Sequence, residues 1–178
     1  MLRLIPAPLH RLGYRLAHAL RKRWWRLRRP RLTGCRVLAF DGEGRVLLVR
    51  HSYGSGNWMA PGGGVRRGED PLHAAARELA EETGCGLADG WYVALLEERG
   101  HGAINVVHVL AGRALGTPVA DKREIVDAAF FAPDALPTPM AALMRRELPG
   151  WLTAAGAGRP VPTRPPPPIS SPPPAPKA

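Results

Sequence analysis

Apolar side chains recur along the chain with two different periods, and these periods predict its elements. Over residues 9–29 six apolar residues recur every three or four positions, the period of a helix, and basic residues take the opposite face. Pro6 and Pro8 precede this predicted helix, and Pro30 ends it. Runs rich in β-branched, aromatic and other apolar residues predict five strands, at 35–40, 46–50, 91–96, 104–110 and 125–131.

Proline and glycine mark the remaining boundaries. Pro71 suits a first helical turn and Gly84 follows a helix end, so a helix is predicted over 71–83. A closing helix is predicted over 139–152, interrupted at Pro149 and Gly150. Residues 41–44 read as a turn, and residues 53–64 as a loop with a short extended piece around Trp58.

Composition divides the chain into three segments. Residues 1–31 hold ten Lys and Arg and no acid, whereas the remainder holds 15 basic and 15 acidic side chains. The net charge of +10 therefore belongs to the first segment and not to the fold. Residues 32–155 have the composition of one globular domain. Residues 156–178 contain ten prolines and no acid, which predicts a disordered or polyproline tail.

The cysteine content and the lengths of the apolar runs bear on where in the cell the protein is located. Two cysteines, Cys35 and Cys85, are too few for a disulfide framework and fit a reducing cytoplasm. No apolar run approaches the roughly 20 residues that span a bilayer. Arg and His interrupt every apolar stretch before residue 32, unlike a signal peptide. We expect a cytoplasmic protein, with a peripheral position at a membrane surface as an extension of that expectation.

The two ends leave alternatives open. The basic helix over 9–29 has an apolar stripe and Trp24 and Trp25 near one end, as membrane-surface helices do. Its charge equally suits non-specific contact with nucleic acid, and the third interpretation is a helix docked on its own domain or an unstructured arm. The four prolines at 165–168 suit a proline-recognising domain, or they belong to a plain disordered end.

Three glutamates gather on the helix predicted over 71–83. Glu78, Glu81 and Glu82 are spaced i, i+3 and i+4, which places their Cβ atoms about 5–6 Å apart. Such carboxylates repel one another unless a cation lies among them, and their oxygens suit Mg²⁺ or Mn²⁺ with substrate phosphates in the remaining positions. The alternative is a solvated acidic face with Arg77 paired to Glu81.

The spacing over residues 63–85 resembles the Nudix hydrolase signature at every defined position. The matching residues are Gly63, Glu69, Arg77, Glu78, Leu79, Glu81, Glu82, Gly84 and Cys85, with Cys85 where an aliphatic residue is usual. Residues 58–64 also resemble the family's approach to this signature, with Ala60 where a larger apolar residue is common. The resemblance covers about residues 33–150 and implies an α/β/α sandwich with a mixed sheet. It implies Mg²⁺- or Mn²⁺-dependent hydrolysis of a nucleoside diphosphate linked to another group, or of a nucleoside triphosphate.

The resemblance also implies roles for individual residues. It assigns metal binding to Glu78, Glu81, Glu82 and the carbonyl of Gly62, with Arg77 positioning a glutamate by ion pairing. One glutamate, Glu78 or Glu82, would orient or deprotonate the attacking water. Glu124 is the candidate for a further metal ligand or base, with Glu97 and Glu98 as rivals and an exposed strand start as its alternative interpretation. The residues assigned to substrate binding are Gly63, Gly64, Glu69 and Arg50, with Glu69 also a supporting carboxylate.

Other functions stay open at this point. One alternative is a non-catalytic ligand-binding module of the same fold, and another is a membrane-associated hydrolase of lipid-linked pyrophosphates. The specific substrate and a homodimer are not marked in the sequence. Trp58, Trp91, Tyr53 and Phe131 either stack on a base or pack within the domain. His51 and the other histidines show no metal-ligand spacing and are interpreted as structural.

Overall fold

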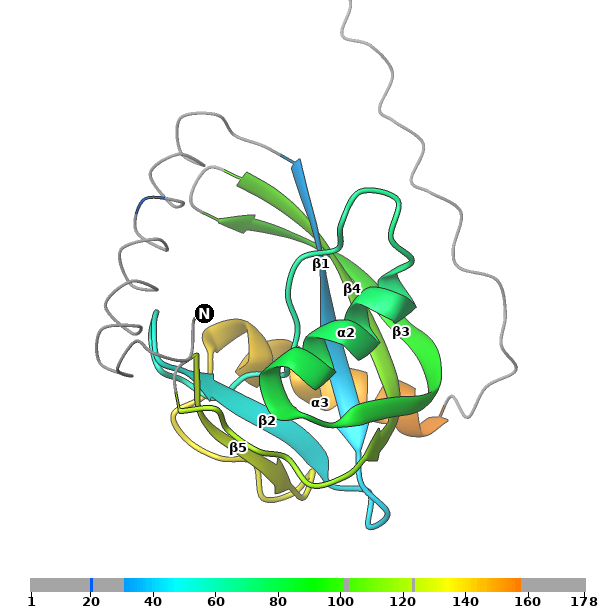
Figure 1. Cartoon of the computed structure of the whole chain (residues 1–178), viewed down its shortest axis with the longest axis vertical. Helices are drawn as coiled ribbons and strands as arrows, with labels where there is room; N and C mark the ends of the chain where they lie inside the picture. Colours follow the sequence, from blue (N-terminus) through cyan, green and yellow to red (C-terminus); the bar gives the residue numbers. More distant parts are fainter. Residues whose placement is uncertain (1–19, 21–30, 101–102, 123, 158–178) are drawn as a thin grey trace, which may run out of the picture.

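The computed structural model describes Leu20 and residues 31–100, 103–122 and 124–157 of the 178-residue chain. The helix predicted over 9–29 lies outside the described residues except for Leu20, and so does the tail beyond residue 157. The described elements are β1 (Arg31–Phe40), β2 (Val46–His51), α2 (Pro71–Thr83), β3 (Gly86–Gly100), β4 (Ala103–Leu115), β5 (Ile125–Phe131) and α3 (Ala142–Ala157) (Figure 1).

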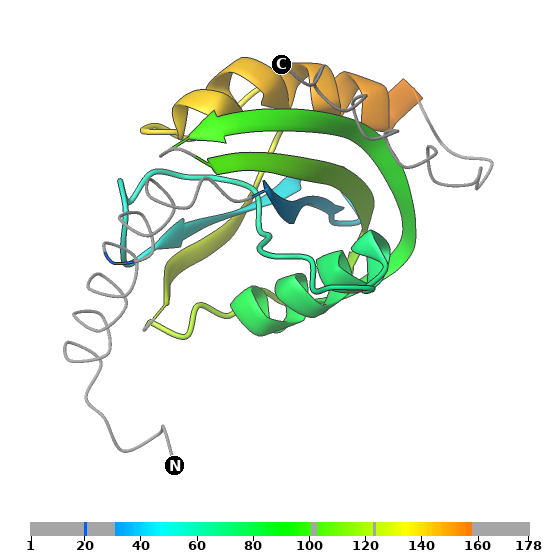
Figure 2. The ribbon, with the colours of Figure 1, turned by 90° about the horizontal axis from the view of Figure 1, so that it is seen from above.

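The strands form one mixed sheet in the order β3-β4-β1-β2-β5. β1 runs parallel to β4, and the other neighbouring pairs are antiparallel. Figure 2 shows α2 on one face of this sheet and α3 on the other. The α/β/α sandwich that the sequence predicts is therefore confirmed.

Two apolar clusters join the helices to the sheet. Because successive side chains of a strand point to opposite faces, β1 contributes to both clusters. Val37 of β1 packs in the cluster that contains Leu79 of α2, whereas Leu38 packs in the cluster that contains Leu148 of α3. All four side chains are fully buried, so both faces of the sheet are covered at its centre.

A glycine-rich loop completes the sheet between β1 and β2. These two strands pair next to their turn, at Phe40 and Val46. Farther along, Met59 pairs with Val49 of β2, and Gly64 pairs with Gly34 of β1. The Cys35 N–H donates to the Gly63 carbonyl at 2.9 Å, and the Val37 N–H to the Pro61 carbonyl at 2.8 Å. The segment 59–64 thus acts as a further strand, and it fixes the glycines beside β1.

The predicted interruption of the last helix is wrong. α3 runs from Ala142 through Pro149 and Gly150 to Ala157, so it begins later than predicted and includes two residues assigned to the tail. Proline removes one helical N–H. The packing of Met144, Leu148, Trp151 and Ala155 against the sheet overrides that loss, while Pro149 lies on the exposed side. No helix in the described part of the chain is both long and apolar enough to cross a bilayer.

Candidate active site

Helix α2 is held at both ends, which fixes the direction of its glutamates. The Asp70 side chain accepts a hydrogen bond from the Leu72 N–H at 2.7 Å and caps the start. Gly84 adopts a left-handed conformation (φ 72°) and donates to the Ala80 carbonyl at the end. Burial of Ala75 and Leu79 against the sheet sets the rotation of the helix. One flank of α2 consequently faces the glycine loop.

Glu82 is buried at the junction of α2 and this loop. Its side chain is 8% exposed, and its Oε2 accepts a hydrogen bond from the Gly62 N–H at 3.0 Å. Burial raises the pKa of Glu82 to about 8, opposed by the Gly62 hydrogen bond and the charge of Arg36, while Glu78 and Glu124 raise it further. The charges of Glu78 and Glu124 therefore act on the carboxyl group of Glu82.

Two of the three consecutive glycines in the loop leave no room for side chains. Gly62 has φ 148°, and a Cβ there would overlap the Cys35 carbonyl. A Cβ at Gly63 would overlap the Glu78 carboxylate. Only glycine allows the backbone to approach both β1 and Glu78 this closely.

Arg77 joins the loop to the helix through four hydrogen bonds. Its Nε and Nη2 donate to the two oxygens of Glu69 at 2.8 and 3.0 Å, and Nη2 also donates to the Gly64 carbonyl at 3.0 Å. Its Nη1 donates to Glu78 Oε1 at 2.7 Å. The two bonds from Arg77 to Glu69, together with one from the Arg66 N–H, lower the pKa of Glu69 to about 2. Glu69 therefore braces the loop, and its assignment to substrate binding stays a prediction.

Glu81 points away from this junction. Its side chain is 56% exposed, with Oε2 lying 3.5 Å from Arg77 Nη1 and Oε1 lying 4.0 Å from Arg66 Nη2. Glu81 thus lies on a solvent-exposed face and pairs with Arg77, as the alternative interpretation of the sequence had it. Glu78 and Glu82 face the loop instead. Within the described residues, no three His, Cys, Asp or Glu side chains are gathered closely enough to form a metal site.

The structure distinguishes Glu124 from its rivals. Glu124 precedes β5, its Oε1 accepts a hydrogen bond from the Tyr53 hydroxyl at 3.0 Å, and its charge acts on Glu82. Glu97 is exposed on β3, and the side chain of Glu98 lies outside the described residues. Glu124 is therefore the better placed of the two described candidates.

Arg50 lies near the same junction but is already engaged. Its guanidinium pairs with Asp127, including an Nε hydrogen bond of 2.8 Å, and it lies 5.4 Å from the centroid of the Trp58 ring. Trp58 in turn contacts Phe131 edge-on, at 4.9 Å between ring centroids. These aromatics pack together, and the assignment of Arg50 to substrate binding stays a prediction.

His51 was missed as a member of the site. It ends β2, is 9% exposed, and its Nε2 lies 3.6 Å from Glu82 Oε1. Arg36 of β1 was also missed, although its charge acts on Glu82. No local spacing encodes these contacts, because they form only when β1 and β2 pack beside α2. The available signal for His51 was its place at the end of a buried strand that leads into the glycine loop.

The family model described as NUDIX domain matches residues 30–151. The chain belongs to the NUDIX family. It is 43% identical over 63 residues to an RNA pyrophosphohydrolase of Bartonella bacilliformis, covering 31% of this chain and 37% of that protein. It is 37% identical over 76 residues to diphosphoinositol polyphosphate phosphohydrolase 2 of Rattus norvegicus, covering 43% and 42%. The chain thus spans less than half the length of these curated relatives.

A solved structure extends the likeness to the whole NUDIX fold. The crystal structure of a MutT NUDIX hydrolase from Burkholderia pseudomallei matches with a TM-score of 0.61 and 26% identity, covering 70% of this chain and 97% of that one. NUDIX hydrolases generally need a divalent metal. The chemistry of the residues at the junction suits such a cation, because a cation beside the buried Glu82 would offset the repulsion between its charge and those of Glu78 and Glu124, although these described side chains do not themselves form a closed group of three ligands.

Proposed function

We propose that this chain is a divalent-metal-dependent hydrolase that cleaves a pyrophosphate bond. The substrate is a nucleoside diphosphate linked to another group, or a nucleoside triphosphate. The observation that carries the proposal is the buried Glu82, which accepts the Gly62 N–H and whose pKa is raised by burial and by the charges of Glu78 and Glu124. The names of the relatives, an RNA pyrophosphohydrolase and a diphosphoinositol polyphosphate phosphohydrolase, support pyrophosphate chemistry.

The metal-binding role in this proposed reaction falls to the glutamates and one backbone carbonyl. Glu78, Glu81, Glu82 and the Gly62 carbonyl would hold Mg²⁺ or Mn²⁺, with Glu124 as a further ligand or base. A bound divalent cation would neutralise phosphate oxygens and acidify a water molecule. Glu81 would reach this set by leaving its exposed contacts with Arg77 and Arg66.

Water attack on phosphorus needs an oriented nucleophile and a stationary phosphate. Glu82 or Glu78 accepts a proton from the attacking water. The oxygen of that water bonds to phosphorus, and the P–O bond to the bridging oxygen breaks, so that this oxygen leaves with the other product. Arg77 keeps Glu78 in position through the hydrogen bond from Nη1. Gly63 and Gly64 let the backbone approach the phosphates, and Arg50 would neutralise charge on the same substrate.

The proposal is tested by product release from a panel of pyrophosphate compounds. The panel holds nucleoside triphosphates, ADP-ribose, nucleotide sugars, dinucleoside polyphosphates, a 5′-triphosphorylated RNA and a prenyl diphosphate, each with Mg²⁺ and with Mn²⁺. Turnover of one class that Glu82→Gln abolishes and Glu43→Gln retains would support the proposal. Glu43 suits this control because it lies in the exposed turn after β1. Silence across the panel, from folded protein that binds metal, would indicate a ligand-binding module instead.

The finer expectations on location and partners remain proposals. We propose a cytoplasmic position, a homodimer, and a contact with a membrane surface or nucleic acid through residues 9–29, which apart from Leu20 lie outside the described residues. Cosedimentation with anionic vesicles tests the membrane contact. Equal pelleting of a chain that begins at Leu32 would contradict it.

A further inference from the structure

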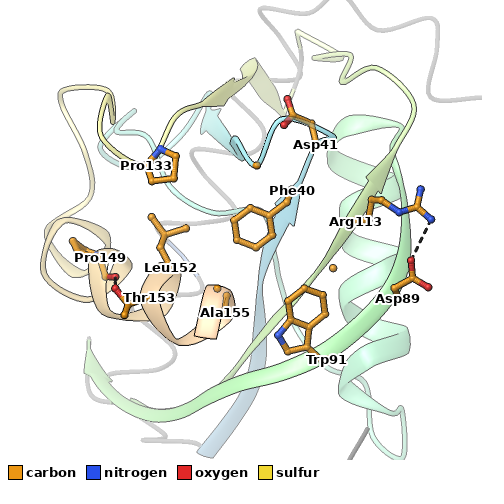
Figure 3. A pocket seen from close by; sticks show the side chains of 13 residues that line it. Phe40, Asp41, Asp89, Trp91, Arg113, Pro133, Pro149, Leu152, Thr153 and Ala155 are labelled. Carbon is orange, nitrogen blue, oxygen red and sulfur yellow. Dashed lines mark hydrogen bonds and ion pairs between the residues drawn. The ribbon is translucent and has the colours of Figure 1, made fainter. Parts of the chain in front are cut away.

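A cavity lies at the opposite end of β1 from the glycine loop, on the face of the sheet that α3 covers. It has a volume of about 850 Å³ and is lined by Phe40 at the end of β1, Trp91 of β3 and Leu152 of α3. Figure 3 shows these three side chains around a common space, with Pro133 and Pro149 at its border. None of residues 61–85, which include the signature, lines the cavity. The proposed reaction therefore leaves it without a role.

The walls of the cavity match one type of ligand. Its size is that of a typical ligand site, and its walls are mainly apolar and aromatic. Aromatic-lined grooves of this kind bind proline-rich segments in the polyproline conformation, which costs little ordering entropy. The border carries the acids Asp41 and Asp89, and each is paired with an arginine, Asp41 with Arg45 and Asp89 with Arg113. An occupant that is apolar and rich in proline fits the walls.

The chain itself supplies a segment of that composition at this place. Ala155 and Gly156, in the last turn of α3, line the cavity, so the chain leaves α3 at the cavity border. The following residues, 158–178, contain ten prolines, two arginines, one lysine and no acid. A polyproline segment advances about 3.1 Å per residue, so even its first few residues are long enough to cross the cavity.

We propose that the proline-rich segment 158–178 docks into this cavity of the same molecule, against Trp91 and Phe40. A segment joined to its site by a short connection has an effective concentration in the millimolar range, so even a weak contact is populated. The cavity is a docking surface for the tail, independent of the reaction at the glycine loop.

Site-specific photo-cross-linking in the full chain tests the docking. The photoreactive residue replaces Thr153, which lies on the exposed border of the cavity, and in a matched control it replaces Arg146, which is exposed on the same helix outside the cavity. We expect position 153 to cross-link to residues 158–178 several-fold more than position 146, with a yield that does not change on dilution. Equal yields from the two positions would overturn the proposal. A yield that falls on dilution would also overturn it, by assigning the site to the tail of a second copy.

A second measurement uses a variant that leaves the folded domain unchanged, so that unfolding cannot explain its result. Replacing the four prolines at 165–168 with serine alters only residues outside the described fold. This variant should lose the cross-link from position 153, and it should bind an added peptide of residues 158–178 more tightly than the unaltered chain does, because its cavity is open. Equal peptide affinity of the two proteins, or binding by neither, would contradict the docking.

Discussion

The backbone N–H of Gly62 donates a hydrogen bond of 3.0 Å to Glu82 Oε2, across the junction of the glycine loop and α2. This contact connects a carboxylate whose charge is costly to bury with a loop that is itself paired to β1. The position of the loop and the position of the carboxylate therefore depend on one another. Four predictions follow from the contacts around this junction.

Gly62→Ala should destabilise the protein and reduce hydrolysis. An alanine there combines an unfavourable φ with an overlap of the Cys35 carbonyl, so we expect the free energy of unfolding to fall by about 2 kcal/mol or more. Gly64→Ala is the matched control, because its Cβ would meet nothing within 4 Å, and we expect a change within about 0.5 kcal/mol. Urea unfolding measures both. Equal losses in the two variants would contradict the prediction.

Glu82→Gln should abolish activity without weakening the fold. A glutamine still accepts the Gly62 N–H and is neutral without taking up a proton, whereas burial raises the pKa of Glu82 to about 8, so in EDTA at neutral pH the free energy of unfolding should rise by about 1–3 kcal/mol. Hydrolysis should fall about 100-fold or more, because outer contacts of a metal site alone are worth 10–100-fold. Thermal unfolding and product release on the same sample measure the two effects. A variant that loses activity only because it unfolds would sink this prediction.

The Glu69–Arg77 pair should make stability depend on acid pH. The folded-state pKa of Glu69 is lowered from 4.5 to about 2, so its contribution is present above pH 4.5 and is lost as the pH falls toward 2. The melting temperature of Glu69→Gln should lie below that of the unaltered chain at neutral pH, and the difference should vanish over this range. In an Arg77→Met background, Glu69→Gln should have little further effect at any pH. A difference that persists at pH 2 would show that another contact is responsible.

Glu124→Gln should impair hydrolysis far more than Glu97→Gln does. Glu124 acts on Glu82 and is oriented by the Tyr53 hydroxyl, whereas Glu97 is exposed on β3. We expect a loss of about 10–100-fold for Glu124→Gln, partly recovered at high Mn²⁺ concentration, and no loss for Glu97→Gln. Steady-state rates over a metal titration decide between them. Comparable losses would return Glu97 to the list of site residues.

The elements that the sequence predicts best are those with local boundary signals. α2 and β5 have the predicted bounds, because Asp70, Pro71 and Gly84 define the helix locally and β5 is a short apolar run. β3 and β4 extend well beyond their predicted ends, since their outer residues are held by pairing with each other rather than by their own propensity. α3 continues past Pro149 for the related reason that its buried face decides its course.

The individual roles within the candidate site were less predictable than its location. Spacing alone treats Glu78, Glu81 and Glu82 as equivalent neighbours on a helix. Their difference arises from the loop, which buries Glu82 and leaves Glu81 exposed. His51 and Glu82 are 31 positions apart in the sequence and lie on different elements. A contact of this kind cannot be predicted from the periodicity of apolar residues.

The pairing of residues 59–64 with both β1 and β2 has a consequence for how the protein would adapt to its ligands. Loops around phosphates are often ordered only on binding, and the loss of conformational entropy then weakens affinity. Here the glycine segment loses that freedom when the sheet forms, so its amides should exchange with solvent as slowly as those of the neighbouring strands. Discrimination among substrates must then come from surfaces outside this segment, because the segment itself cannot move without separating the two halves of the sheet.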